Sequence, residues 1–215
     1  MAKIEPVGLY LIVEAMPGPS VQERLKATLA ATKFASALVC APQGQTLDAA
    51  TARPFVELIQ AQDVAALIDN DAQLARTLRA DGVHLRASDN LEAKATEARE
   101  ILGARYIIGG HAQTRHDAMM LGEQGAEYVA FDNSDASADQ ADFVEWWAQI
   151  FEVPCIAFDV ATPQDATTMA SLGADFVAFR LISAGTPGDA QDSARSFADA
   201  AAVGLKEFAS RNAEK

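Results

Sequence analysis

The stretch LGEQGAEYVAFD, Leu121–Asp132, is repeated in outline as SLGADFVAFR, Ser171–Arg180. Both copies share the order Gly-Ala-acid-aromatic-Val-Ala-Phe, and ADGVHLR at 80–86 is a weaker third copy. In each copy a helical segment ends at glycine or another small residue, and a short apolar run begins within a few positions. This order is typical of a loop from a helix into a strand. The repeat predicts a chain that alternates helices with strands.

Eight short runs of β-branched and aromatic residues are expected to be strands. They are Gly8–Val13, Ala37–Ala41, Val64–Ile68, Gly82–Leu85, Tyr106–Ile108, Tyr128–Phe131, Cys155–Phe158 and Phe176–Phe179. The runs are apolar almost throughout, as parallel strands covered on both faces are, and segments with helical spacing separate them. We therefore expect one (β/α)8 TIM-barrel domain over residues 1–215, with an open, doubly wound sheet as the alternative.

Capping chemistry predicts where several helices begin. Capping-box spacing occurs at Ser20 with Glu23, at Asp89 with Glu92 and at Thr114 with Asp117, and Thr162 stands before Pro163. Asn70 is also placed to cap the helix that follows it. The predicted helix starts agree with the predicted ends of the strands.

The composition is that of an ordinary globular protein, with half of the residues apolar and 22% charged. The formal net charge of -13 argues against nucleic acid or an anionic membrane as a partner, because both are held by clustered lysine and arginine. Cys40 and Cys155 lie in apolar runs, as buried thiols do, and no segment approaches a membrane span, so we expect a cytoplasmic protein. Trp146 and Trp147 have the spacing of a helix that packs on the barrel or takes part in a homo-oligomer.

In a (β/α)8 barrel the active site lies at the carboxyl ends of the strands. The residues that follow the apolar runs are polar and of mixed sign: Glu14, Gln43, Asp69, Asn70, Asp71, Arg86, Asp89, His111, Asp132, Asp159 and Arg180. Asp69, Asn70, Asp71 and Asp89 follow neighbouring strands and offer the oxygen ligands that Mg²⁺ prefers. Helix capping alone is the competing interpretation of Asn70 and Asp89.

Histidine and arginine at this rim are candidates for acid–base catalysis or for contact with an anion. His111 directly follows its strand, whereas His84 lies in mid-strand as a packed residue and His116 lies in the first turn of a helix, in solvent. Arg180 precedes the glycine-rich stretch 184–188, and the two together offer an anion site. Asp159 would repel a phosphate.

These motifs resemble the thiamine-phosphate synthase family and its relatives, the thiazole tautomerases. GLYLIV at 8–13 is similar to the family's first strand, and ILGARYIIGG at 101–110 is similar to its fifth. LIDNDAQLARTLRADGVHLRASD at 67–89 resembles its central signature. The resemblance runs from residue 8 to about residue 184. It implies a (β/α)8 barrel that joins a pyrimidine methyl pyrophosphate to a thiazole phosphate with release of pyrophosphate.

The resemblance also implies Mg²⁺ as cofactor, with Asp89 and Asn70 as metal ligands, and a carboxylate of the family pattern is an amide at Asn70. Other features depart further. CAPQGQ at 40–45 carries no cation, His111 replaces a serine, FDNSDASAD at 131–139 is acidic, and FDVAT at 158–162 replaces a glycine-rich phosphate turn. The histidine base of the tautomerases aligns with Gln113.

Three functional hypotheses follow. The first is a thiamine-phosphate synthase-like transferase whose catalytic residues are His111 and Arg86. Its substrate-binding residues would be Asp69, Asn70, Asp132, Asp159 and Arg180. The second, suggested by the missing cations, is a catalytically inactive or repurposed small-molecule-binding barrel. The third is an enzyme that uses the acidic rim and His111 on a substrate that is not a pyrophosphate.

Overall fold

The computed structural model describes residues 7–132, 140–181 and 184–213, and within them eight strands alternate with eight helices. The elements are β1 (Gly8–Glu14), α1 (Pro19–Ala31), β2 (Phe34–Cys40), α2 (Ala49–Gln60), β3 (Ala65–Asp69), α3 (Ala72–Leu78), β4 (Gly82–Leu85), α4 (Leu91–Leu102), β5 (Ile107–His111), α5 (Arg115–Glu123), β6 (Tyr128–Phe131), α6 (Gln140–Ile150), β7 (Cys155–Ala157), α7 (Pro163–Leu172), β8 (Phe176–Arg180) and α8 (Pro187–Ala213). All eight predicted strands are confirmed.

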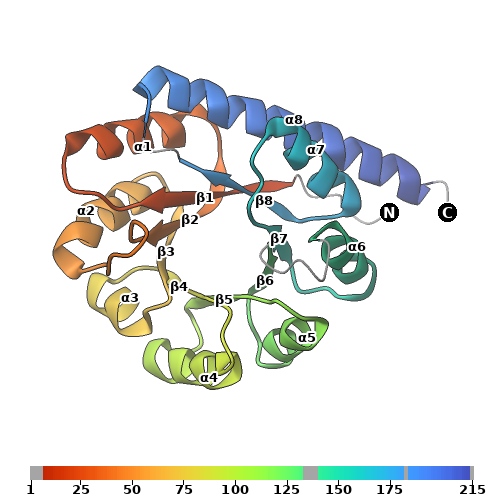
Figure 1. The fold of residues 1–215 in the computed structure, drawn as a ribbon, viewed down its shortest axis with the longest axis horizontal. Helices are drawn as coiled ribbons and strands as arrows, with labels where there is room; N and C mark the ends of the chain where they lie inside the picture. Colours follow the sequence, from red (N-terminus) through yellow and green to blue (C-terminus); the bar gives the residue numbers. More distant parts are fainter. Residues whose placement is uncertain (1–6, 133–139, 182–183, 214–215) are drawn as a thin grey trace.

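The strands form a closed ring in chain order, and every neighbouring pair is parallel. The helices surround the ring, and the long α8 lies across α7 and α1 (Figure 1). The protein is therefore a single-domain (β/α)8 barrel, and the pairing of β1 with β8 excludes an open sheet. Among the helices of the described residues, none is long and apolar enough to cross a membrane.

Alternate residues of each strand enter two different cores, because successive side chains of a strand point to opposite faces. Leu9, Leu11 and Val13 of β1 pack outward into the layer shared with the helices. Tyr10 and Ile12 of the same strand point into the barrel. The interior core is small and its other members come from five further strands: Leu38, Cys40, Leu67, Tyr128, Ala130, Ile156, Phe158 and Ala178.

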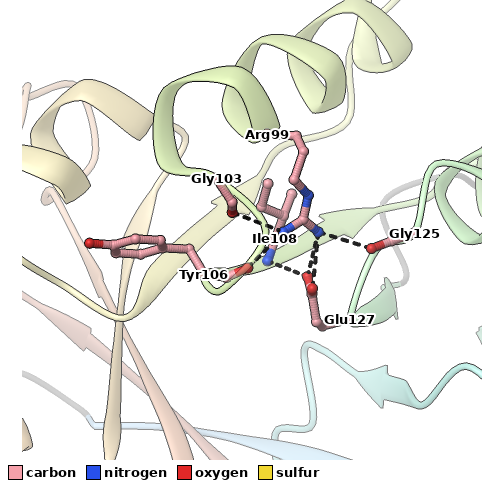
Figure 2. Close-up of polar contacts among 6 residues, drawn as sticks. All are labelled: Arg99, Gly103, Tyr106, Ile108, Gly125 and Glu127. Carbon is pink, nitrogen blue, oxygen red and sulfur yellow. Dashed lines mark hydrogen bonds and ion pairs between the residues drawn. The ribbon is translucent and has the colours of Figure 1, made fainter.

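The acidic residue of the sequence repeat links neighbouring strands at the amino end of the barrel. The backbone N–H groups of Ala66, Ile108 and Cys155 donate to the carboxylates of Asp81, Glu127 and Asp175 at 2.8, 2.7 and 2.8 Å. Around Glu127, Arg99 of α4 adds an ion pair at 3.0 Å and donates to loop carbonyl groups (Figure 2). The repeat is thus a structural device that holds β3, β5 and β7 to the strands that follow them.

The predicted capping box of Thr114 with Asp117 is confirmed. The predicted start of α7 at Pro163 is also confirmed, and there Thr162 and Asp165 form a second capping box. The other predicted caps are wrong by one or two residues. The cap of α3 is Asp71, which accepts the N–H of Leu74, and α4 begins after Asn90. Helix α1 begins after Gly18 with Pro19 in its first turn, so the Ser20 cap is also wrong.

Candidate active site

A polar pocket of about 470 Å³ opens at the carboxyl ends of the strands. Its side chains continue the inward-facing positions of the barrel interior, two residues further along each strand. They include Glu14, Cys40, Asp69, Arg86, His111, Asp132, Phe158 and Arg180, with Asp159 and Gln113 at the edge. Six of the predicted site residues therefore meet in one pocket: Asp69, Arg86, His111, Asp132, Asp159 and Arg180.

Both arginines of this pocket are paired with carboxylates. Arg86 Nε donates to Asp69 Oδ1 at 3.0 Å and its Nη2 donates to Asp69 Oδ2, a bidentate pair. This hydrogen bond raises the pKa of Arg86 above its usual range. The Asp69 side chain is 7% exposed and that of Arg86 is 62% exposed, so Arg86 reaches from a buried partner toward solvent. Arg180 Nη1 lies 3.6 Å from Glu14 Oε1.

His111 of β5 and Asp132, which follows β6, form a third pair in the pocket. His111 Nε2 lies 3.0 Å from Asp132 Oδ2, and the two side chains are 13% and 15% exposed. The atoms are within ion-pair distance but are not aligned as a hydrogen bond. A histidine beside a carboxylate in a partly dry pocket can hold a proton or contact an anion.

Buried aromatic residues and His84 form the floor of the pocket. His84 Nδ1 lies 2.9 Å from Tyr128 Oη, and the His84 ring stacks on Phe158 with centroids 4.9 Å apart. Burial, with smaller contributions from His111 and Arg86, lowers the pKa of His84 to about 3. The prediction of a packed, hydrogen-bonded His84 is confirmed, and its ring also borders the pocket.

The structure does not bring Asn70 and Asp89 into this pocket. Asn70 has a left-handed backbone with φ of 53°, and its Oδ1 accepts the backbone N–H of Arg86 at 3.1 Å. It lines a separate pocket of about 170 Å³ beside α3 and α4. Asp89 is exposed in the turn before α4. Strand parity explains the difference from Asp69, because Asn70 is one position out of phase with the inward-facing residues.

Comparison with known proteins identifies the family of this chain. The family model described as thiamine monophosphate synthase matches residues 9–184. The chain belongs to the thiamine monophosphate synthase family. The family resemblance inferred from the sequence is confirmed.

The chain is 36% identical to the thiamine-phosphate synthase of Erythrobacter litoralis, over 93% of this chain and 98% of that protein. It is also 36% identical to the enzyme of that name from Rhodospirillum centenum, over 56% of this chain and 61% of that protein. The solved structure of the thiamine phosphate pyrophosphorylase from Pyrococcus furiosus shares 18% identity, with a TM-score of 0.77 over 93% of this chain and 97% of that one. This last likeness shows the fold.

The residues expected to hold Mg²⁺ do not fit that role as they lie here. Asp69 is held by Arg86, Asn70 Oδ1 is held by the Arg86 backbone, and Asp89 lies outside the pocket. In the described part of the chain, no three His, Cys, Asp or Glu side chains form a group able to hold a metal ion. We therefore assign no step of a reaction to a metal.

Cys40, His84 and Phe158 are among the pocket residues that were not identified from the sequence as site residues. Each was interpreted as part of an apolar strand, and each is buried. Strand parity is the signal that finds them, since all three share the inward face with the interior core. The acidic loop that follows β6 lies outside the described residues from 133 to 139.

Proposed function

We propose that this chain is a thiamine-phosphate synthase-type transferase, which joins a pyrimidine methyl pyrophosphate to a thiazole phosphate in thiamine biosynthesis. The observation that carries the proposal is the 36% identity to a thiamine-phosphate synthase across nearly the whole of both chains. The polar pocket at the carboxyl ends of the strands supports it, because barrel enzymes react at that face.

The charges of the pocket suit a transfer in which the carbon–oxygen bond to pyrophosphate breaks and the thiazole nitrogen bonds to the freed methylene carbon. Positive charge develops on that carbon, and the carboxylates of Glu14, Asp69 and Asp132 lie around the pocket that would hold it. Arg86 and His111 are the proposed catalytic contacts to the departing pyrophosphate, which carries the electron pair of the broken bond. Arg180 is a further proposed contact.

A substrate contact is also proposed for Asp159 at the pocket edge, and Asn70 is proposed to serve substrate binding indirectly, by positioning the backbone of Arg86. An adjoining pocket of about 500 Å³ shares Asp159 and Arg180 with the first. Its wall is mainly apolar, with contributions from Val160, Phe179 and Phe197. Two adjoining pockets with shared lining residues, one polar and one mainly apolar, suit two substrates that must meet at a common boundary.

A repurposed or inactive small-molecule-binding barrel is the second candidate. The observation that favours it is the pairing of both pocket arginines with carboxylates. Glu14, Asp69, Asp132 and Asp159 outnumber the two guanidinium groups, so a pyrophosphate enters a pocket that already has excess negative charge. A cationic or neutral ligand meets no such opposition.

The deciding experiment measures pyrophosphate and thiamine phosphate after the protein is given both substrates, with Mg²⁺ or with EDTA. Formation of both products in equal amounts supports the transferase. His111→Asn is expected to lower turnover by about 10²-fold or more, the usual effect of removing an acid–base group. His116→Asn on the exposed face of α5 is the matched control and should leave turnover unchanged.

The assay with EDTA and the Asp89→Ala variant together test whether turnover requires Mg²⁺. Loss of turnover in both would make Asp89 a functional ligand despite its position outside the pocket. If folded protein forms neither product while a substrate raises its melting temperature, the transferase proposal is wrong and the binding protein remains.

The proposal includes a cytoplasmic location, supported by two free, buried cysteines, and phosphorylated small molecules as substrates. It also includes a homo-oligomer. Trp146 is half-buried with the Arg115 guanidinium 4.7 Å from its ring centroid, and the exposed Ile150 lies on the same helix. Trp147, in contrast, is a core residue with 1% exposure, and its Nε1 donates to the Val153 carbonyl.

A further inference from the structure

Three side chains form a hydrogen-bonded chain inside the barrel. Tyr10 Oη lies 2.9 Å from Tyr128 Oη, which in turn lies 2.9 Å from His84 Nδ1. All three side chains are buried, and the chain runs from the barrel interior to the pocket floor. Within the described residues, Tyr10 Oη has no hydrogen-bond partner other than Tyr128.

The direction of these hydrogen bonds follows from counting protons. If the Tyr10 hydroxyl donates to Tyr128 and the Tyr128 hydroxyl donates to His84 Nδ1, both hydroxyl protons have an acceptor. In the reverse direction His84 Nδ1–H donates to Tyr128, Tyr128 donates to Tyr10, and the Tyr10 proton has no acceptor. A buried donor without an acceptor disfavours that arrangement by about tenfold or more. His84 Nδ1 is therefore the acceptor.

The other ring nitrogen of His84 meets the pocket. Nε2 has no hydrogen-bond partner among the described residues. It is also not among the buried polar atoms that lack a partner, so it is accessible to solvent. His84 lines the pocket, as do Arg86, two residues further along the chain, and His111 of the neighbouring strand β5. Since Nδ1 is an acceptor in the neutral ring, the proton is on Nε2.

We propose that His84 is a specificity-determining residue that presents a neutral Nε2–H donor to the pocket, held in that tautomer by the hydrogen bonds from Tyr10 through Tyr128. The ligand group that it fits is an acceptor without a proton, such as a phosphoryl oxygen or a ring nitrogen lone pair. The tautomer is independent of the proposed function, whereas the ligand contact rests on it.

A neutral donor at this position differs from the two arginines in what it selects. Arg86 and Arg180 attract any anion, whereas a single N–H in a buried floor rejects a ligand that places a donor above it. The surroundings of the ring strengthen this selection, because the stack on Phe158 holds the plane of the His84 ring and the hydrogen bond with Tyr128 orients its Nδ1.

The tautomer is tested by NMR of protein with ¹⁵N-labelled histidine. The chain has three histidines, so His84→Gln and His116→Gln variants assign the imidazole signals. At pH 7 the expected pattern for His84 is a pyridine-type Nδ1 and a pyrrole-type Nε2. A pyrrole-type Nδ1, or an imidazolium, overturns the proposal whether or not the protein turns over substrate.

The ligand contact is tested by adding the pyrimidine methyl pyrophosphate and the thiazole phosphate separately. One of them should shift the His84 Nε2–H signal, and a signal that neither substrate moves overturns the contact. In the kinetic arm, His84→Met should raise the KM for that substrate about tenfold, with a smaller change in kcat, and His84→Gln should recover most of the loss through its amide N–H. An unchanged KM in a folded His84→Met protein is contrary to the proposal.

The two arms separate this inference from the proposed function. A pyrrole-type Nε2 that shifts with a substrate, in a protein without turnover, supports the inference and contradicts the transferase. Turnover together with a pyrrole-type Nδ1 supports the transferase and contradicts the inference. Thermal melting of each variant shows whether it has folded.

Discussion

His84 is a core residue and a site residue at once. The residue is 2% exposed, its ring packs against Phe158, and its Nδ1 contacts Tyr128. Burial disfavours the imidazolium and lowers the pKa to about 3. An unfolded chain has histidine near its ordinary pKa of about 6.5. The difference makes this residue a source of pH-dependent stability.

Stability is expected to fall as pH falls from about 6.5 toward 3. In that window the unfolded chain binds a proton at His84 and the folded protein does not, so acid favours unfolding by up to about 1.4 kcal/mol for each pH unit. His84→Gln should remove this part of the slope. Urea unfolding of both proteins at several pH values between 4 and 7 measures it. Parallel plots of unfolding free energy against pH would contradict the buried, neutral histidine.

At the scale of elements, β5 and β6 fit together only because β5 has a glycine opposite Tyr128. A Cβ built on Gly109 would lie 1.9 Å from Cζ of the Tyr128 ring, where no atom can stand. The glycine lets the tyrosine lie across the barrel interior and reach His84 and Tyr10. The pair Gly109–Gly110 in the sequence is the local mark of this close approach.

Gly109→Ala is expected to destabilise the protein by about 1–3 kcal/mol, the usual cost of overpacking a core, because the Tyr128 ring must move. The same change should disturb the NMR signals of His84. Gly122→Ala is a matched control in α5, where the nearest atom to the new Cβ would be 3.6 Å away. It should be neutral or slightly stabilising. Thermal melting of the two variants distinguishes the effects, and equal melting temperatures would refute the close approach.

The acidic residues of the repeat also join neighbouring elements, through hydrogen bonds. Asp81 Oδ2 accepts the Ala66 N–H at 2.8 Å and the Gln60 side chain at 3.0 Å, so it links β3, β4 and α2. Asp81→Ala leaves the Ala66 N–H without this acceptor and should cost about 1–3 kcal/mol of stability. The pocket is at the other end of the barrel, so the KM values should not change.

The control for Asp81→Ala is Glu123→Ala on the exposed end of α5, which should change stability by less than about 0.5 kcal/mol. Urea unfolding compares the two variants. A loss of activity in Asp81→Ala without loss of stability would mean that the repeat has a role in the site.

At the scale of the whole molecule, the closed barrel buries both cysteines. Cys155 lies in β7 and is fully buried, and burial raises its pKa to about 12. Cys40 lines the pocket but is only 7% exposed, and burial raises its pKa to about 11. Both thiols are therefore protonated at neutral pH, and the thiolate is the reactive form.

A thiol reagent at pH 8 is expected to label neither cysteine of the folded protein at an appreciable rate. Labelling should follow the opening of the barrel, with Cys40 reacting before Cys155 because it borders the pocket. Mass spectrometry of Cys40→Ser and Cys155→Ser proteins over time measures each rate. Rapid labelling of Cys155 in folded protein would mean that the ring opens far more readily than its continuous pairing implies.

Much of the architecture follows from the sequence by itself. The eight strands, their parallel arrangement and the capping box of Thr114 with Asp117 depend on local hydrophobic period and turn chemistry, which a short window of sequence contains. The family follows from the motifs between 67 and 110. The polar rim also follows, because the residue after each apolar run is known once the strands are known.

Only the tertiary structure decided which rim residues act together. Asp69 pairs with Arg86 in the pocket, whereas Asn70 and Asp89 lie outside it, because Asp69 and Arg86 share the inward face and the other two do not. The chain from Tyr10 through Tyr128 to His84 joins residues 118 and 44 positions apart, which no local pattern connects. Closure of the ring and its strand register bring these side chains together, and both are properties of the whole barrel.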